Sequence, residues 1–305
     1  MKFSIGYPLL GHPSDPAFVD PAFLAEFARV AEECGYDSVN ITEHPMPGDK
    51  WLGAGGHHAL DPFVGLAFAA AVTTRLRLLT NLTVLPYRNP FLLAKTVASL
   101  DRVSGGRTIL GVGTGYLKPE FFALGVDFDE RNDLFDEAIA LSRMAWTGES
   151  VTFEGRHFSV KGNSAQPTPV QDPVPIWIGG NAKLTRQRVA TVAQGWMPMP
   201  NPPLYAATRR SPVLEHFDDL AAMIADMESR KAEAGRTDPI DIMFMSFDET
   251  LPCTGDWDPA RHVEEVRTSA ELGVTVHVTT APGSSPDEAL AMVRTFAREV
   301  VAVFD

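Results

Sequence analysis

A chain of 305 residues with 45% apolar side chains is long enough to bury one large hydrophobic core. Its formal net charge of −13 repels phosphate backbones and anionic membrane surfaces, so neither nucleic acid nor a membrane is expected as a partner. The only two cysteines, Cys34 and Cys253, are too few for a disulfide framework and lack metal-ligand spacing. With no pattern typical of a signal peptide or a spanning segment at its start, the chain is predicted to be cytoplasmic.

Short apolar strands alternate with helix-length segments along the chain. The first unit is the clearest, because the strand FSIGYPL is followed by Asp20, a suitable helix N-cap, and by Pro21 at the first helical position. Gly35 then stands where a helix commonly ends. Seven further strands are predicted at 37–43, 76–84, 107–113, 175–179, 195–199, 240–246 and 274–279. Further helices are predicted at 61–73, 90–103, 129–147, 182–193, 211–235, 258–272 and 286–303.

Eight strand–helix units in a chain of this length predict an α/β fold, a (β/α)8 TIM barrel that forms a single domain over residues 1–305. A doubly wound open sheet is the alternative. Long segments at 115–128, 199–210 and 247–257 follow strands, so they are expected to insert at the carboxyl-terminal face of the barrel. A fourth long segment, 148–174, precedes the fifth strand and contains a probable hairpin, VTFEGRHFSV.

The carboxyl ends of the predicted strands carry the candidate site residues. If the second strand ends at Glu43, then His44 lies on the rim where barrel enzymes assemble their sites. A single histidine after a strand is often structural. Three further strand ends carry polar or glycine-rich clusters, however, and this coincidence predicts a ligand site: TNLT (80–83), GTGY (113–116) and IGGNAKLT (178–185).

The cluster IGGNAKLT suits an anion. Gly179 and Gly180 permit close approach to the backbone, and a helix beginning near Asn181 directs free amide groups and a positive dipole end at a phosphate. A plain strand–helix turn is the alternative at this position. The glycines of GVGTG do not match a dinucleotide fingerprint, because the third glycine is misplaced and no acidic residue follows a second strand.

The sequence gives little support for a metal site or for a site of covalent hydrolysis. His57 and His58 are adjacent, so their side chains are expected to point apart, and no metal site is predicted there. The sequence contains no GxSxG motif, and neither cysteine has a histidine in a matching motif, which disfavours covalent hydrolysis.

Several ordered motifs resemble the bacterial luciferase-like family of flavin and deazaflavin oxidoreductases. The resemblance is carried by NPFLLAKTVASLDRVSGGRTILGVGTGYLKPEFFALGVDFDERNDLFDEAIALSRMAWTG, and YDSVNITEH and PIWIGGNAKLTRQRVATVAQGW resemble the second-strand and fifth-strand motifs of that family. It covers most of residues 3–200 and weakens beyond them. The phrases PEFFALGVDFDER, GRHF and PIWIGG are most similar to members that depend on coenzyme F420.

This resemblance implies a barrel subunit paired as a homodimer through helices near strands two and three. It implies F420 as the cofactor, with FMN as the alternative, and places His44 beside the tricyclic ring as the catalytic residue. Asn81 and Leu82 match a position where F420-dependent relatives have a non-prolyl cis peptide behind the ring, and the two glycines of IGG match the phosphate-binding turn. The cofactor-binding residues expected are Thr80, Asn81, Leu82, Thr114, Tyr116, Gly179, Gly180 and Asn181.

Two positions depart from the family pattern. Leu92 stands where luciferases have an arginine for the FMN phosphate, which disfavours FMN. Tyr116 stands where the F420-dependent sugar-phosphate dehydrogenases have an acidic glutamate, which disfavours sugar-phosphate oxidation. Glu120 is near enough in sequence to approach the site, although capping or solvation of the next turn is the simpler expectation.

The predicted activity is hydride transfer between F420 and a small organic substrate, because a deazaflavin carries a hydride and reacts poorly with oxygen. His44 is expected to stabilise charge on the ring or to relay a proton, with Glu43 as its supporting partner. An FMN-dependent monooxygenase and a non-catalytic flavin-binding barrel are the alternatives. Five basic residues are expected to balance the negative charge of the phosphate and glutamate tail of F420: Lys183, Arg186, Arg188, Arg209 and Arg210. A solvated helix face is the alternative for these residues.

Overall fold

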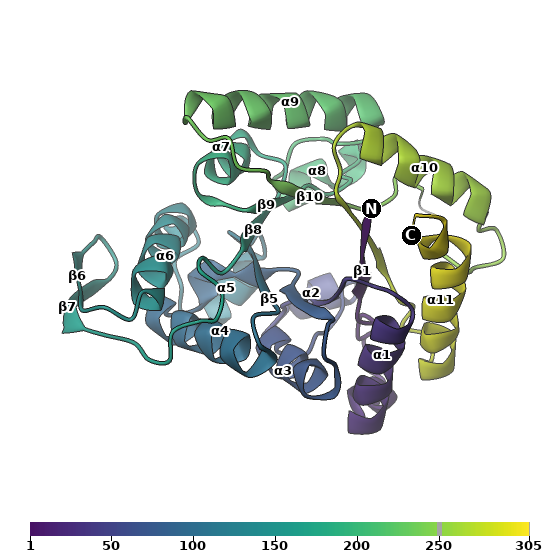
Figure 1. Cartoon of the computed structure of the whole chain (residues 1–305), viewed down its shortest axis with the longest axis horizontal. Coiled ribbons are helices and arrows are strands. Elements are labelled where there is room, and N and C mark those ends of the chain that lie inside the picture. The colour runs from purple at the N-terminus through teal and green to yellow at the C-terminus, as the bar shows by residue number, and fades with distance from the viewer. Residues whose placement is uncertain (249–251, 305) are drawn as a thin grey trace.

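The computed structural model describes residues 1–248 and 252–304, and its strands form the expected closed barrel (Figure 1). Eight parallel strands follow one another around the ring, and pairing of β1 with β11 and of β3 with β5 closes it. The strands of the ring are β1 (Lys2–Gly6), β2 (Ser38–Ile41), β3 (Arg77–Thr80), β5 (Thr108–Gly113), β8 (Ile176–Gly179), β9 (Gly195–Met197), β10 (Asp241–Phe244) and β11 (Val276–Thr280). The short β4 (Thr83–Val84) also pairs with β5.

Helices surround the ring, and five of them begin in the same way. A side chain at the N-cap accepts a hydrogen bond from a backbone amide of the first turn, and proline occupies the next position; the N-caps are Asp20, Asp61, Asn89, Asp258 and Ser285. The long helices are α1 (Pro21–Glu33), α3 (Pro62–Val72), α4 (Pro90–Ser104), α6 (Arg131–Trp146), α7 (Lys183–Val192), α9 (Phe217–Glu233), α10 (Pro259–Glu271) and α11 (Pro286–Glu299). These starts could be read from the sequence because capping is local.

Several predicted boundaries were wrong, among them those of the second strand, the third strand and the helix predicted from 211. The second strand ends at Ile41 rather than Glu43, so His44 lies three residues beyond it. The strand predicted over 76–84 is interrupted after Thr80, where the chain leaves β3 and re-enters the sheet as β4. The helix predicted from 211 begins at Phe217, because the preceding segment is extended and Leu214 forms a bridge with Asn201.

The hairpin predicted at 151–160 is present. Strands β6 (Val151–Glu154) and β7 (Ser159–Asn163) are antiparallel and form a separate two-stranded sheet. It extends from the barrel beside α6, at the left of Figure 1. The hairpin therefore lies outside the ring of strands.

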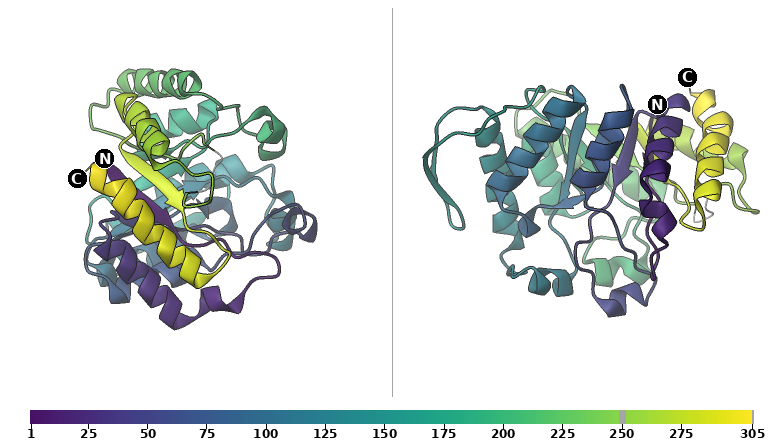
Figure 2. Two further views of the ribbon diagram at one scale, coloured as in Figure 1. Left: turned by 90° about the vertical axis from the view of Figure 1, so that its right-hand side faces the viewer. Right: turned by 90° about the horizontal axis from the view of Figure 1, so that it is seen from below.

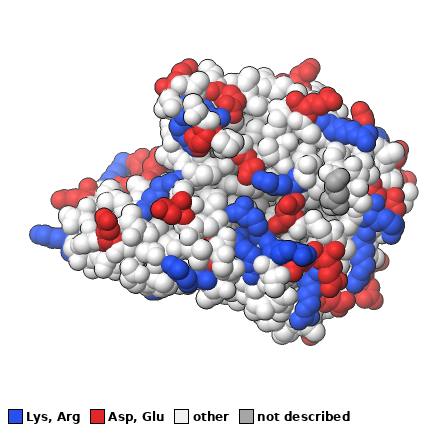
Figure 3. Space-filling view, in the orientation of Figure 1, with Lys and Arg blue, Asp and Glu red and all other residues white. Residues whose placement is uncertain are grey.

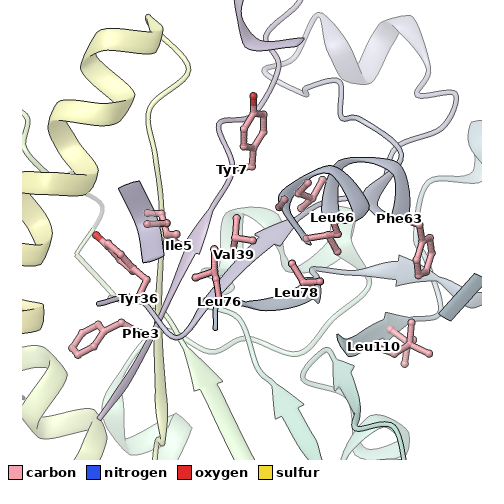
Figure 4. Packing of buried hydrophobic residues seen from close by; sticks show 14 of the residues in the cluster. Phe3, Ile5, Tyr7, Tyr36, Val39, Phe63, Leu66, Leu76, Leu78 and Leu110 are labelled. Carbon is pink, nitrogen blue, oxygen red and sulfur yellow. The ribbon is translucent and has the colours of Figure 1, made fainter. Parts of the chain in front are cut away.

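The hydrophobic core has two parts. Side chains between the strands and the surrounding helices form the larger part, which Figure 4 shows around Phe3, Ile5, Val39 and Leu78. A second cluster packs around the inward-facing Leu79 and comprises Leu79, Ile109, Trp177, Met197, Met243, Val276 and Val278. Neighbouring residues on one strand face opposite ways, as in other barrels. Since the barrel interior is filled, any ligand must lie above it at one end.

Three short helices mark the carboxyl-terminal end of the barrel. They are α2 (Asp49–Leu52), α5 (Lys118–Ala123) and α8 (Pro203–Arg209), and they follow β2, β5 and β9. In the right-hand view of Figure 2 they lie together at the bottom, opposite both termini. Figure 3 shows the face that carries the termini, where acidic and basic side chains are interspersed. Among the described residues, no helix is both long and apolar enough to cross a membrane.

Candidate active site

His44 lies at the carboxyl-terminal rim, as the sequence predicted. Its side chain is 12% exposed, and its Nδ1 is 3.3 Å from Oε2 of Glu120. The imidazole ring packs against Trp51 with 4.5 Å between the ring centroids, and His57 lies edge-on to it at 4.9 Å. Both neighbouring rings come from the segment between β2 and α3. His44 is therefore held in one orientation by an acceptor on one nitrogen and by aromatic packing.

Glu120 is the residue near His44 whose surroundings the sequence reasoning predicted wrongly. Capping or solvation was the simpler expectation, but Glu120 is only 1% exposed. Its carboxylate accepts hydrogen bonds from the backbone amide of Met46 at 3.3 Å and from the hydroxyl of Tyr87 at 3.2 Å. The available signal was an acidic residue within the otherwise apolar helix PEFFA, one turn after the polar GTGY cluster. A buried carboxylate beside an imidazole is a pair suited to proton transfer.

The groups around this pair have strongly shifted pKa values. Burial, followed by the charge of the Glu120 carboxylate, raises the pKa of Tyr87 well above its ordinary value. The hydroxyl of Tyr87 therefore keeps its proton and donates a hydrogen bond to Glu120. Burial, followed by the charges of His44 and His58, lowers the pKa of His57 to about 4. His57 is therefore neutral at pH 7, and it contributes packing and a polar edge without a competing positive charge.

Glu43 is not the supporting partner of His44, contrary to the sequence-based expectation. Its carboxylate accepts a 2.6 Å hydrogen bond from the amide of Val84 and a 2.7 Å bond from Nε of Arg88. Arg88 also pairs with Asp61 at 2.6 Å. Burial raises the pKa of Glu43, while Arg88 opposes that shift. Glu43 therefore ties the start of the β2–α3 segment to β4 and stabilises the rim rather than acting on the ring of His44.

Leu82 forms part of the apolar floor of the mouth. The Asn81–Leu82 peptide bond is cis, as the family resemblance implied, and the Asn81 side chain donates a 3.1 Å hydrogen bond to Asn40. The Leu82 side chain packs against the interior cluster and lies close to two glycines at strand ends. A Cβ at Gly113 or Gly179 would lie 2.7 or 2.4 Å from a methyl carbon of Leu82. The absence of a side chain at Gly113 and Gly179 therefore leaves room for Leu82.

The other candidates on β3 and β5 differ in their availability. Thr80 is fully buried, and its hydroxyl donates a 2.7 Å hydrogen bond to the carbonyl of Gly111, so its side chain joins two strands. Thr114 and Tyr116 are half-buried on the segment after β5. Burial raises the pKa of Tyr116, and its side chain is hydrogen-bonded to Trp51. Tyr116 consequently lies in the same aromatic wall as His44.

The turn after β8 retains the features of an anion site, although Asn181 is not the helix cap. Gly180 has a φ of +116°, which only glycine adopts readily, and its amide donates to the carbonyl of Met197 at 3.1 Å. Asn181 is 1% exposed and binds both backbone groups of Met199. The N-cap of α7 is Ala182, and no side chain caps the helix. The amides of its first turn are thus left for a ligand.

Arg186 and Arg188 do not serve the anion, contrary to expectation. Each is 6% exposed, and each lies in an ion pair that joins helices: Arg186 Nε is 2.5 Å from Asp226, and Arg188 Nε is 2.7 Å from Asp136. These pairs anchor α7 to α9 and α6. Of the three basic residues predicted on this helix, Lys183 is exposed at the end nearest the turn.

His57 and His58 point apart, as predicted. The ring of His57 faces His44, while Nε2 of His58 is 3.1 Å from Nδ1 of His12. In the described part of the chain, one group has donor atoms close enough for a metal ion, namely Glu130, Asp133 and His157. Arg156 pairs with both carboxylates of that group at 2.6 Å, so their charges are already compensated.

The ends of the strands supply a pair of side chains suited to proton transfer, an apolar surface at Leu82 and a helix start without a side-chain cap. Such a combination fits a flat ring system with a phosphate-bearing tail. A sequence profile of luciferase-like monooxygenases matches residues 1–248. The chain belongs to the luciferase-like monooxygenase family.

Individual relatives span nearly the whole chain. An uncharacterised protein of Mycobacterium tuberculosis is 31% identical over 300 residues, covering 94% of this chain and 97% of the relative. The F420-dependent glucose-6-phosphate dehydrogenase of Kineococcus radiotolerans is 32% identical over 275 residues, covering 88% and 75% respectively. Among solved structures, monooxygenase RslO1 of Streptomyces bottropensis superimposes with a TM-score of 0.83 over 100% of both chains at 21% identity. That structural likeness establishes the luciferase-like barrel fold.

Proposed function

We propose that this luciferase-like protein is an F420-dependent oxidoreductase that moves a hydride between the deazaflavin and a small organic substrate. The observation that carries the proposal is the pairing of His44 with the buried Glu120 at the end of the barrel where the strands before Leu82 and Glu120 terminate. The similarity to a relative named as an F420-dependent dehydrogenase supports the choice of cofactor. That relative acts by name on a sugar phosphate, which we do not propose here because Tyr116 stands at the position of the expected acidic residue.

The residues present fit the cofactor. Leu82 offers an apolar surface for the ring, and Gly179 lacks the Cβ that would displace it. The unbonded first-turn amides of α7 and the positive-φ Gly180 suit the phosphate. When bound, the deazaflavin supplies a carbon that carries the hydride. Trp51 and His44 at the same end of the barrel would offer a surface against which a substrate could be held.

His44 has the central role in the proposed mechanism. Its Nδ1 faces Glu120, so its Nε2 is the atom available to exchange a proton with substrate or to stabilise developing charge. Glu120 orients the imidazole ring, while Tyr87 and the amide of Met46 hold Glu120 in place. Trp51 and the neutral His57 restrict water at the imidazole.

The proposal is tested by titrating the protein separately with F420 and FMN and following tryptophan fluorescence. Trp51 touches His44, and Trp196 donates to the carbonyl of Gly180, so both ends of the site report binding. Tight binding of F420 with little of FMN is expected. His44→Ala should then slow hydride transfer by about 10²-fold or more with little change in F420 affinity. His58→Ala is the matched control, because His58 faces His12.

An FMN-dependent monooxygenase is the second candidate, favoured by the match to the luciferase-like monooxygenase profile and by the fold of RslO1. In this reading the same mouth holds a reduced flavin, and the enzyme consumes oxygen. Leu92 lies 71% exposed on the first turn of α4, where luciferases have the phosphate-binding arginine. Preferential FMN binding with substrate-dependent oxygen uptake would establish this candidate. Binding of neither cofactor would refute both and favour a non-catalytic barrel.

We propose further that the protein is a homodimer joined through α3 and α4. These helices pack against each other and carry large apolar side chains exposed to solvent. Val64 is 69% exposed, Phe68 is 38% exposed and Leu92 is 71% exposed. Exposed apolar side chains grouped on neighbouring helices are typical of an interface. The position agrees with the helices that the family resemblance implied.

A further inference from the structure

Three cationic side chains converge on one aromatic ring at the rim of the barrel. The Nζ of Lys118 lies 4.8 Å from the centroid of the Phe128 ring, and the Cζ atoms of Arg131 and Arg210 lie at 4.0 and 5.0 Å. Lys118 begins α5, Arg131 begins α6 and Arg210 follows α8. Segments far apart in the sequence thus bring three positive charges within 5.0 Å of one point.

None of these three cations has an acidic partner within 4.0 Å among the described residues. Arg131 instead donates to the backbone carbonyl of Phe128 at 2.8 Å, with Asp129 acting on it only at longer range. Arg186 differs from them, because its guanidinium is paired with the carboxylate of Asp226. These three cations stand together in a chain whose net charge is −13.

The clustering carries an electrostatic cost that a bound anion would relieve. Burial lowers the pKa of Arg131, and the charge of Arg210 lowers it further. Each cation–π contact with Phe128 returns only about 0.5–1 kcal/mol at such exposed sites. Guanidinium groups bind carboxylates and phosphates through paired hydrogen bonds, so an anionic group is the complementary ligand. The exposed Lys118 and Arg210 are accessible to it.

The cluster is connected to the active site through a short series of aromatic contacts. The ring of Phe128 packs on Phe121 with 5.0 Å between centroids, and Phe121 packs on Tyr87 at 4.7 Å. Tyr87 in turn donates to Glu120, the partner of His44. Helices α5 and α8 also lie at the same end of the barrel in Figure 2. Phe128 is therefore three side-chain contacts away from the carboxylate that accompanies His44.

We propose that Lys118, Arg131 and Arg210 form an anion subsite that binds a carboxylate or phosphate group extending from the active-site mouth. The inference rests on the proposed function for the source of that group. The anionic group belongs either to the glutamyl tail of F420 or to the substrate. The subsite adds binding and specificity at a distance from the ring, so it acts on affinity rather than on the hydride step.

The test compares F420 carrying several glutamyl residues with the form that carries none, since the two share the ring and the phosphate. In the Lys118→Ala/Arg210→Ala double variant, the Kd of the tailed cofactor is expected to rise about tenfold, and the Kd of the tail-less form to stay the same. A Lys161→Ala/Arg29→Ala variant removes the same charge from exposed positions elsewhere and serves as the control. The charge-conserving Lys118→Arg/Arg210→Lys variant should retain binding, which separates lost charge from misfolding.

A second titration uses inorganic tripolyphosphate alone, followed by calorimetry, and does not depend on the cofactor. Weaker tripolyphosphate binding in Lys118→Ala/Arg210→Ala, with both forms of F420 unaffected, assigns the subsite to an acidic substrate group. If the wild type binds no F420 at all, the proposed function fails and this titration alone decides the subsite. The subsite is overturned if the double variant matches its charge control with every ligand, or if the tail-less cofactor loses affinity equally.

Discussion

Replacement of Gly179 by alanine tests whether the strand-end glycines exist to accommodate Leu82. The backbone at Gly179 admits alanine because its φ is not positive, so any penalty must come from contact. A Cβ there would lie 2.4 Å from Cδ2 of Leu82, and its next neighbour is the carbonyl oxygen of Val112 at 3.7 Å. The first distance forces Leu82 to move, whereas the second is ordinary contact.

The expected loss of stability depends on which atoms must move to make room for the new methyl group. Overpacking of this kind costs about 1–3 kcal/mol of unfolding free energy, and a displaced Leu82 should also weaken F420 binding. Leu82→Ala alone should cost about 1–2 kcal/mol, because the side chain is only partly buried. In the Leu82→Ala background the clash is gone, so Gly179→Ala should then cost less than about 0.5 kcal/mol.

Urea denaturation of the wild type, both single variants and the double variant measures this coupling. Gly11→Ala is the control, because the nearest atom to a Cβ at Gly11 is 3.7 Å away, at Pro13. An equal cost of Gly179→Ala in both backgrounds would refute the reasoning, since the penalty would then not arise from Leu82. Unchanged stability with impaired F420 binding would show that the glycine serves the ligand directly.

Three further predictions concern proton transfer, pH and assembly. Glu120→Gln should slow hydride transfer by about tenfold or more in stopped-flow measurements while F420 affinity holds, because His44 loses its charged acceptor. Burial lowers the pKa of His277 to about 3, so on acidification below pH 6.5 the unfolded state gains a proton that the folded state does not. The free energy of unfolding measured in urea should therefore fall by about 1.4 kcal/mol for each pH unit. In His277→Gln this free energy should fall less steeply with decreasing pH. Val64→Asp should convert a dimer into a monomer in sedimentation equilibrium, since Val64 lies beside Phe68 on the apolar face of α3.

Each of these has a control or a contradicting result. Glu149→Gln removes an exposed carboxylate and should leave the hydride step unchanged. A slope with pH that is identical in wild type and His277→Gln would contradict the assignment to His277. Val303→Asp introduces the same charge at another exposed apolar position and should leave the oligomeric state as it is.

The order of strands and helices was predictable from the sequence because it depends on local physics. Asp20 before Pro21 and Asn89 before Pro90 specify helix starts by hydrogen bonds within a single turn. Boundaries that depend on contacts from elsewhere were predicted wrongly. Helix α9 begins late because Leu214 bridges to Asn201, a contact that no local pattern contains.

The candidate site was predictable in position but only partly in its members. His44, Asn81 and Leu82 follow strand ends, and parallel strands bring those ends together whatever the details of packing. Asn181 and Arg186 were predicted to serve the ligand, yet both are buried and bound to other parts of the chain. Whether a polar side chain faces a ligand or a neighbouring helix depends on its three-dimensional surroundings.

The sequence by itself determined the barrel class, the family and the histidine at the rim, because periodicity, capping and ordered motifs are properties of short segments. Only the tertiary structure decided which carboxylate accompanies His44. Glu43 is its neighbour in sequence but turns toward Arg88, and Glu120, 76 residues away, occupies the position beside the ring. Adjacent residues leave an extended chain on opposite sides, whereas folding brings the ends of separate strands to one mouth.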